Sequence, residues 1–150
     1  MTRDDSMKKD DFDLQNFLPY LLNRAAEESS LEFQKVYKDH YGMLRNEWRV
    51  LFHLGNYGEM TAKEIGEQAR LHKTKISRAV HRLEERRYLL RTRSETDRRV
   101  ENLMLTALGQ SVYHELCGIA GQYDAKLAAQ FSTDEVALLR KMLRQLAHMG

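Results

Sequence analysis

Basic side chains gather in one fifth of this chain. Residues 70–99 hold eleven Lys or Arg and four Asp or Glu, a net charge of +7, while the other 120 residues carry a net −5. Ammonium and guanidinium groups at this density are the donors with which proteins bind phosphates and the edges of bases. The segregation is typical of a nucleic-acid-binding module on a neutral or acidic body, although a solvated basic surface has the same charge.

The first half of this basic block has the spacing of an amphipathic helix. Over residues 73–87, Ile76, Val80 and Leu83 stand at i, i+4 and i+7, which predicts one buried stripe. The remaining sides carry donors suited to DNA: Lys73, Thr74, Lys75, Ser77, Arg78, His81 and Arg82. Because an α-helix fits the major groove, we expect this helix to read DNA there.

The roles of these side chains differ. We expect Lys73 and Arg82 to bind phosphates rather than bases. Arg78 suits a phosphate or the O6 and N7 atoms of guanine equally well, and His81 either contacts DNA or is merely exposed. The acids at the helix end are expected to pair with arginines of the helix or of the following hairpin: Glu84 and Glu85.

The second half of the basic block predicts a β-hairpin, or wing. Two β-compatible runs, residues 88–93 and 99–105, flank the polar stretch 94–98. The wing residues that we expect at DNA are Arg91, Arg93, Asp97, Arg98 and Arg99. At the tip, Arg98 and Arg99 can enter the minor groove, whose negative potential attracts arginine.

A short helix and a turn must hold the reading helix in place. Thr61 and Glu64 form a capping box, so Thr61 is expected to open this helix close to the DNA backbone. Residues 70–72 form the turn that follows. Helix, tight turn, second helix and hairpin together indicate a winged helix-turn-helix lobe.

Two further helices precede this lobe. Residues 13–39 show helical spacing of apolar side chains, and Pro19 within them marks either a kink or a fresh first turn. Residues 45–54 form the next helix. The loop expected after it is marked by Gly55, Asn56 and Gly58.

Two more helices follow the wing. Thr106 caps a long helix that extends to about residue 130, and Ser132 with Glu135 forms a second capping box that opens the last helix. The apolar stripe of this last helix comprises Val136, Leu139, Met142, Leu143 and Leu146. The fold class is therefore mostly α with a small β-hairpin wing.

Composition excludes several other classes of protein. Hydrophobic residues make up 42% of the chain, so a packed core is expected rather than general disorder. The single cysteine, Cys117, cannot form an internal disulfide, and without a visible signal peptide or apolar span a cytoplasmic protein is expected. The six scattered histidines lack zinc spacing, and no catalytic residues, metal ligands or cofactor motif are predicted, so an enzyme is not expected.

The order and spacing of these motifs over residues 43–109 resemble the MarR family of bacterial regulators. The matching stretches are Trp48-Arg49-Val50-Leu51, Leu71-His72-Lys73-Thr74-Lys75-Ile76-Ser77-Arg78, Leu83-Glu84-Glu85, Asp97-Arg98-Arg99 and Leu103-Met104-Leu105-Thr106-Ala107-Leu108-Gly109. The last two stretches match the wing pattern Asp-x-Arg followed by Leu-Thr-x-x-Gly. One departure is Arg87, where the family often has a glycine, and we expect the junction there to be built differently.

The resemblance implies a homodimer that binds a palindromic double-stranded operator and controls transcription, most often as a repressor. Residues 12–42 and 106–150 would supply the dimerisation helices, residues 43–105 the DNA-binding lobe, and residues 1–11 a disordered tail. Arg99 matches the wing-tip arginine that enters the minor groove, and Asp97 the acid that orients it. The alternative function is a winged helix that docks proteins without reading DNA.

The resemblance also implies an effector, since family members often respond to small aromatic or phenolic acids. The candidate pocket residues are Tyr20, Arg24, Trp48, Phe52 and His53. The aromatic side chains would stack on a ring, and Arg24 or His53 would pair with a carboxylate. Ordinary core packing at the junction of two helices is the alternative for each aromatic residue.

Overall fold

The computed structural model describes residues 11–149, so the predicted tail lies outside the described residues except for Asp11. The chain divides into two compact units, one ending at Glu32 and one beginning at Phe33. A 3-10 turn, η2 (Leu14–Asn16), precedes helix α1 (Leu18–Tyr41), which continues into the second unit. Pro19 is the second residue of α1, so it marks a fresh first turn, where its missing N–H costs no hydrogen bond.

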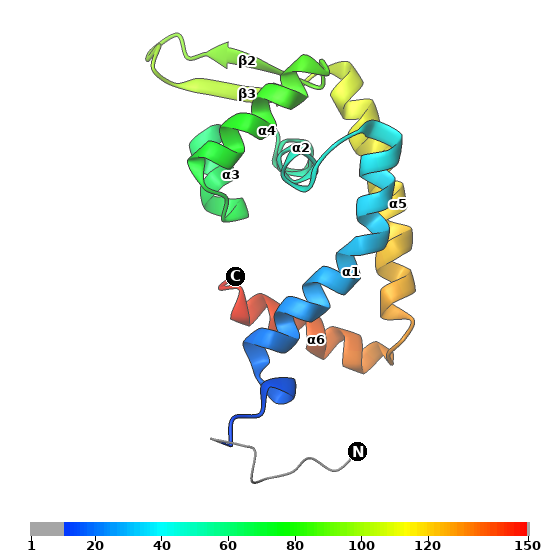
Figure 1. The fold of residues 1–150 in the computed structure, drawn as a ribbon. Coiled ribbons are helices and arrows are strands. Elements are labelled where there is room, and N and C mark those ends of the chain that lie inside the picture. The colour runs from blue at the N-terminus through cyan, green and yellow to red at the C-terminus, as the bar shows by residue number, and fades with distance from the viewer. Residues whose placement is uncertain (1–10, 150) are drawn as a thin grey trace. The chain divides into compact units, whose positions relative to one another are not determined.

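The second unit contains the predicted winged helix-turn-helix and the helices after it (Figure 1). Its elements are α2 (Arg45–Tyr57), β1 (Met60–Thr61), α3 (Ala62–Ala69), α4 (Lys73–Glu85), β2 (Leu89–Arg93), β3 (Glu101–Leu105), α5 (Ala107–Ala128) and α6 (Thr133–Leu146). The fold is therefore mostly helical with a small wing sheet and long helices toward both ends, as predicted.

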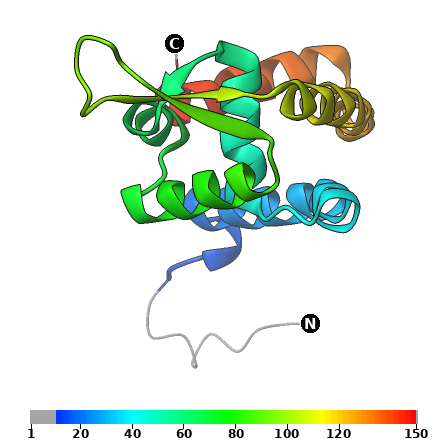
Figure 2. The ribbon, with the colours of Figure 1, turned by 90° about the horizontal axis from the view of Figure 1, so that it is seen from above.

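The wing sheet has one strand more than the sequence indicated. Its antiparallel strands lie in the order β1-β3-β2, and Leu90 lies opposite Met104. The two-residue strand β1 pairs Met60 with Leu103, an arrangement that local periodicity cannot reveal. Figure 2 shows the β2–β3 hairpin extending away from the helices, with its loop at the far end.

One continuous core holds the winged lobe together. The predicted stripe of α4, formed by Ile76, Val80 and Leu83, is at most 2% exposed. It belongs to the same buried cluster as Val50 of α2 and Leu103 of β3. Because this stripe holds one side of α4 in the core, the opposite side of the helix is exposed to solvent.

The loop predicted at Gly55 is wrong, because α2 continues to Tyr57. A Cβ atom on Gly55 would lie 2.4 Å from Cδ1 of Tyr113, so the glycine makes room for an aromatic ring of α5. The turn begins at Gly58, whose φ of +84° is a conformation that favours glycine. Close packing of α2 and α5, not a chain reversal, accounts for Gly55.

The expectation that Arg87 would change the helix–wing junction is also wrong. Arg87 adopts φ +65°, so it takes the left-handed conformation usual for a glycine after a helix. Its N–H donates to the Glu84 carbonyl at 2.9 Å, and Tyr88 N–H donates to the Leu83 carbonyl at 2.9 Å. These two bonds form a Schellman motif, which outweighs the backbone strain of a residue with a Cβ.

Candidate nucleic-acid interface

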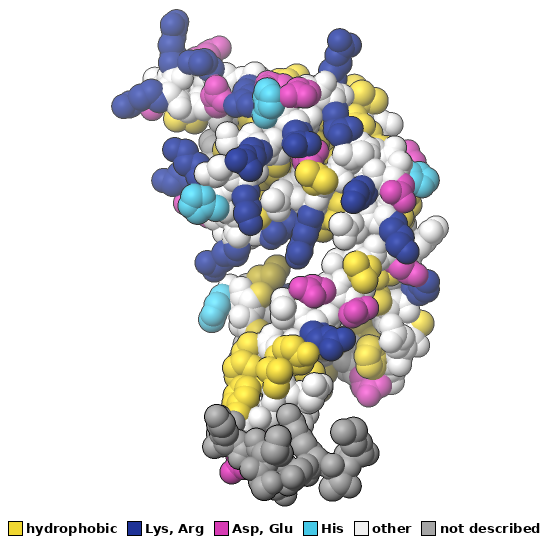
Figure 3. All heavy atoms as spheres, in the orientation of Figure 1, with side chains coloured by type: hydrophobic (Ala, Val, Ile, Leu, Met, Phe, Trp, Pro, Cys, Tyr) yellow, Lys and Arg dark blue, Asp and Glu magenta, His cyan; other side chains and the backbone are white. Residues whose placement is uncertain are grey.

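Helix α4 presents a continuous basic and polar face to solvent. All seven residues predicted to face DNA are exposed: Lys73, Thr74, Lys75, Ser77, Arg78, His81 and Arg82. Figure 3 shows Lys and Arg side chains crowded over the part of this face formed by α3, α4 and the hairpin. The side of α4 opposite its buried stripe is therefore rich in hydrogen-bond donors, as contact with nucleic acid requires.

The start of α3 has the predicted capping box. Thr61 Oγ1 accepts a hydrogen bond from Glu64 N–H at 3.1 Å, and Glu64 Oε1 accepts one from Thr61 N–H at 3.0 Å. The bond that the Thr61 backbone N–H donates to the charged carboxylate is the main reason that the pKa of Glu64 is below its usual value. The Thr61 hydroxyl is thus used within the helix cap, and its contact with the DNA backbone stays a prediction.

The wing tip carries an arginine held by an acid. Arg99 is 92% exposed at its side chain, and its backbone N–H and its Nε both donate to Asp97 Oδ1, at 3.1 and 3.2 Å. Arg93 and Arg98 are exposed as well. The geometry is that of an acid orienting an arginine beyond the end of the hairpin, where a minor groove could receive it.

Arg91 braces the wing against α4. Its Nε lies 3.2 Å from both carboxylate oxygens of Glu84, and its Nη1 lies 3.1 Å from Glu101 Oε2. Burial lowers the pKa of Arg91, but the hydrogen bonds that it donates to Glu101 and Glu84 outweigh burial and leave the pKa above its ordinary value. The guanidinium therefore joins β2 to both α4 and β3, and its predicted contact with DNA is not needed to explain its position.

The second predicted acid has a different partner from the one expected. Glu84 pairs with a wing arginine as predicted, but Glu85 Oε1 lies 2.6 Å from Nε2 of His81, one turn earlier in α4. Both side chains of this pair are more than 60% exposed. The Glu85 carboxylate therefore orients the His81 ring rather than an arginine.

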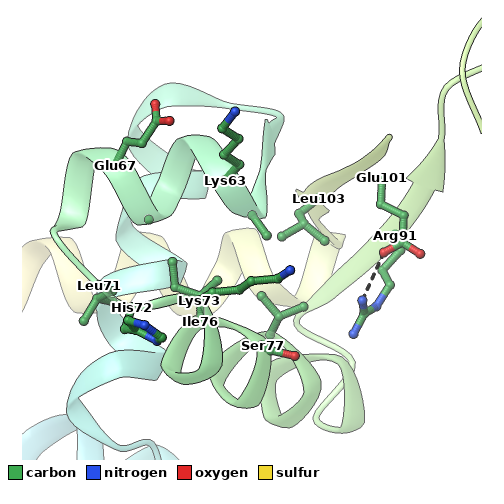
Figure 4. Close-up of a pocket in the computed structure, with 13 residues that line it drawn as sticks. Lys63, Glu67, Leu71, His72, Lys73, Ile76, Ser77, Arg91, Glu101 and Leu103 are labelled. Atoms are coloured by element: carbon green, nitrogen blue, oxygen red, sulfur yellow. Dashed lines mark hydrogen bonds and ion pairs between the residues drawn. The ribbon is translucent and has the colours of Figure 1, made fainter. Parts of the chain in front are cut away.

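A cavity of about 690 Å³ opens between α3, α4 and the wing (Figure 4). Its polar rim is formed by Lys63, Glu67, Lys73, Ser77, Arg91 and Glu101, and Ile76, Val80 and Leu103 supply apolar walls. Two predicted reading residues, Lys73 and Ser77, thus border the same hollow as the Arg91 brace. The reading helix and the wing share one concave surface.

The candidate effector residues fall into two groups. In the first unit, Arg24 Nη1 lies 3.4 Å from the Tyr20 hydroxyl. In the second, the Trp48 and Phe52 rings pack edge to face at 5.1 Å, and His53 Nδ1 lies 2.6 Å from the Arg49 carbonyl. That the five residues form one pocket stays a prediction.

Sequence reasoning missed an aromatic cluster around Trp48 and Phe52. Phe33 lies edge to face with Trp48 at 5.4 Å, and Tyr113 lies edge to face with Phe52 at 5.3 Å. Tyr37 is 2% exposed and its ring lies 5.7 Å from that of Trp48. The spacing of Phe33 and Tyr37 on α1 was the available signal, because residues four apart share a helix face.

Sequence reasoning also assigned no role to Arg86 or Glu47. Arg86 counted only as one more charge of the basic block, yet its guanidinium donates to two backbone carbonyls at the end of α1. Glu47 is 1% exposed. Nothing local in the sequence distinguishes these residues from solvated charges.

In residues 11–149, no helix combines the length and apolar character that crossing a bilayer requires. Across the same part of the chain, no three His, Cys, Asp or Glu side chains come together as metal ligands would.

Comparison with known proteins gives consistent matches. A family model described as the MarR family matches residues 41–100. The transcriptional regulator SarZ of Staphylococcus epidermidis is 30% identical over 95 residues, which are 61% of this chain and 64% of SarZ. A MarR-family regulator from Silicibacter pomeroyi is 25% identical, with a TM-score of 0.78 over 89% of each chain.

The fold also matches Bordetella bronchiseptica BpsR, whose DNA binding is regulated by 6-hydroxynicotinic acid. The TM-score is 0.84 over 94% of this chain and all of BpsR, at 19% identity. The likeness therefore extends beyond the winged lobe to the flanking helices.

Proposed function

This chain belongs to the MarR family of winged helix-turn-helix transcriptional regulators, and from that membership we propose that it is a homodimeric repressor of a palindromic operator. Membership implies a DNA-binding dimer and excludes an enzyme. We further propose that a small aromatic acid releases the operator.

One observation carries the DNA-reading part of the proposal. The exposed face of α4 and the exposed Arg99 of the wing are two sets of donors joined by the Arg91 brace. Helix α4 enters the major groove, and the wing tip enters the adjacent minor groove. A protein-docking winged helix is the second candidate function, but it has no use for a net charge of +7 in residues 70–99.

We assign the donors of α4 to two tasks. Lys73 and Arg82 bind phosphates, which fixes the register of the helix without reading sequence. Arg78 lies near the middle of the exposed face and reads a guanine edge. His81 is the residue of this set least available to DNA, because its ring is already paired with Glu85 within the helix.

Arg78→Ala should relax base preference at one position of each half-site. A bidentate arginine–guanine contact discriminates against the wrong base by about 1–3 kcal/mol, so the preference there should fall about tenfold or more. To measure this preference, the protein first selects an operator from random DNA. Affinity is then measured with each base pair of that operator changed in turn. Arg82→Ala, which removes the same charge from the same helix, should weaken all sequences alike. Uniform weakening by Arg78→Ala would contradict its base-reading role.

The effector proposal rests on the aromatic cluster around Trp48. The Trp48 and Phe52 rings, with His53 the next residue of α2, suit an aromatic carboxylate. BpsR, which shares the fold, responds to a compound of this class. Aromatic acids at 100 times their dissociation constant should stabilise the protein by about 2.7 kcal/mol and release operator DNA.

A thermal-shift series paired with operator release tests this proposal. Benzoate and hydroxybenzoates are compared with cyclohexanecarboxylate, which keeps the charge but lacks the aromatic ring. Phe52→Leu keeps an apolar side chain and should weaken the response to the aromatic acids selectively. Equal responses to benzoate and cyclohexanecarboxylate, or none to any acid, would contradict an aromatic effector.

A further inference from the structure

Arg86 is turned inward from the basic block. It is the C-cap residue of α4, at the end of the helix farthest from Lys73. Its Nη1 donates to the Tyr41 carbonyl and its Nη2 to the Gly42 carbonyl, both at 2.7 Å. The two arms of one planar guanidinium thus hold two consecutive carbonyls at the end of α1, more than forty residues earlier in the chain.

Glu47, near the start of α2, is the buried acid beside Arg86. Its side chain is 1% exposed, and its Oε2 accepts a hydrogen bond from Leu44 N–H at 3.0 Å, which satisfies the start of α2. Its other oxygen, Oε1, has no hydrogen-bond partner and lies 3.8 Å from Nε of Arg86. A buried carboxylate is destabilising unless a positive charge lies near it, and the Arg86 guanidinium supplies that charge to Glu47.

Gly42 gives independent support for a built contact. Its φ is +64°, a conformation that favours glycine. A Cβ atom placed there would lie 3.1 Å from both Nη1 and Nη2 of Arg86. A side chain at this position would therefore press on the guanidinium where it binds the two carbonyls.

We propose that Arg86 and Glu47 are positioning residues for DNA reading. Together with the carbonyls of Tyr41 and Gly42 they form a clamp, which fixes the C-terminal end of α4 on the C-terminal end of α1. The clamp sets the angle at which each protomer presents α4, and so the distance between half-sites that the dimer accepts. This inference rests on the proposed function, because it requires a dimer on a two-part operator.

The geometry of α4 shows why a hinge at its far end matters. A helix of 13 residues is about 20 Å long. A tilt of about 10° around the clamped end would move the Lys73 end by about 3.5 Å, close to the 3.4 Å rise of one base pair. A protein with a loosened clamp should therefore tolerate a change of about one base pair in the spacing between half-sites.

The test measures spacing tolerance rather than affinity alone. The wild-type protein first selects an operator from random DNA, and its centre is then lengthened or shortened by one and two base pairs. The wild type should bind the one-base-pair variants at least tenfold more weakly. Arg86→Gln and Glu47→Gln should reduce that ratio to about threefold or less, with the salt dependence of binding to non-operator DNA unchanged. Loss of fold stability alone would lower the active fraction and leave the ratio intact.

Arg87→Gln is the matched control. It removes the same charge from the neighbouring exposed residue and leaves the two hydrogen bonds of Arg86 in place, so it should keep the wild-type spacing profile. If Arg86→Gln does not fold, Arg86→Lys makes the comparison, because lysine keeps the charge but cannot hold two carbonyls with one planar group. An unchanged spacing ratio in the folded variants would overturn the clamp and leave the proposed function standing. Failure of the wild type to select any DNA would instead reject the proposed function.

Discussion

Operator affinity should fall by about three to five orders of magnitude when the salt concentration rises from 50 to 200 mM. That range corresponds to roughly six to ten neutralised phosphates per dimer, each of which releases condensed counterions. The exposed cations of α4 and the wing, with two protomers contributing, can reach that number: Lys73, Lys75, Arg82, Arg93 and Arg98. Fluorescence anisotropy of the selected operator over a salt series gives the slope directly.

A double variant identifies which cations produce that slope. Lys73→Gln with Arg82→Gln removes four phosphate contacts from a dimer, so the slope of log affinity against log salt should fall by between about 3 and 4. Lys38→Gln with Lys141→Gln removes equal charge outside the basic block and should leave the slope unchanged. A wild-type slope near zero would reject DNA as the partner and favour the protein-docking alternative.

Local chemistry explains what could be predicted from the sequence. The capping boxes at Thr61 and Ser132 both form as predicted, because their partners lie three residues away. The buried stripe of α4 was predictable for the same reason, since helical periodicity assigns its two faces. The exposed face of α4, rich in hydrogen-bond donors, was therefore predictable without any knowledge of tertiary structure.

Contacts between distant segments explain what could not be predicted. The strand β1 forms by pairing with β3, where Met60 lies opposite Leu103, and the glycine at position 55 leaves room for the ring of Tyr113. The basic block also contained arginines with different tasks. Arg91 and Arg86 are held by ion pairs and by carbonyls, whereas Arg99 projects into solvent, and charge counting treats all three alike.

The dimer should depend on an apolar stripe of α6 that the protomer leaves uncovered. Within the described residues, α6 contributes no buried side chain. The exposed members of the stripe predicted from the sequence are Leu139, Met142, Leu143 and Leu146, each at least 40% accessible, and the exposed Leu138 flanks them. Helix α6 is nevertheless anchored, because Arg140 binds both carboxylate oxygens of Asp124 on α5, at 2.7 and 3.2 Å. An anchored helix with an uncovered apolar stripe is an element that needs a partner.

Leu143→Lys should therefore dissociate the dimer and abolish tight operator binding. Burying one leucine contributes about 1.5–3 kcal/mol, and a two-fold interface loses it twice, so the dimer should weaken by about 3–6 kcal/mol. That loss corresponds to about two to four orders of magnitude in the dimer dissociation constant. Because a dimer gains operator affinity by binding two half-sites at once, tight binding should fall with it.

Sedimentation equilibrium measures the dimer, and a single half-site duplex separates assembly from DNA reading. Leu143→Lys should bind the half-site as the wild-type protomer does, because position 143 lies outside the winged lobe. Ala137→Lys adds the same charge on the side of α6 opposite the apolar stripe and should remain dimeric. A Leu143→Lys protein that stays dimeric would place the interface elsewhere. Loss of half-site binding in that variant would mean that α6 supports the fold of the lobe and is not a separate assembly surface.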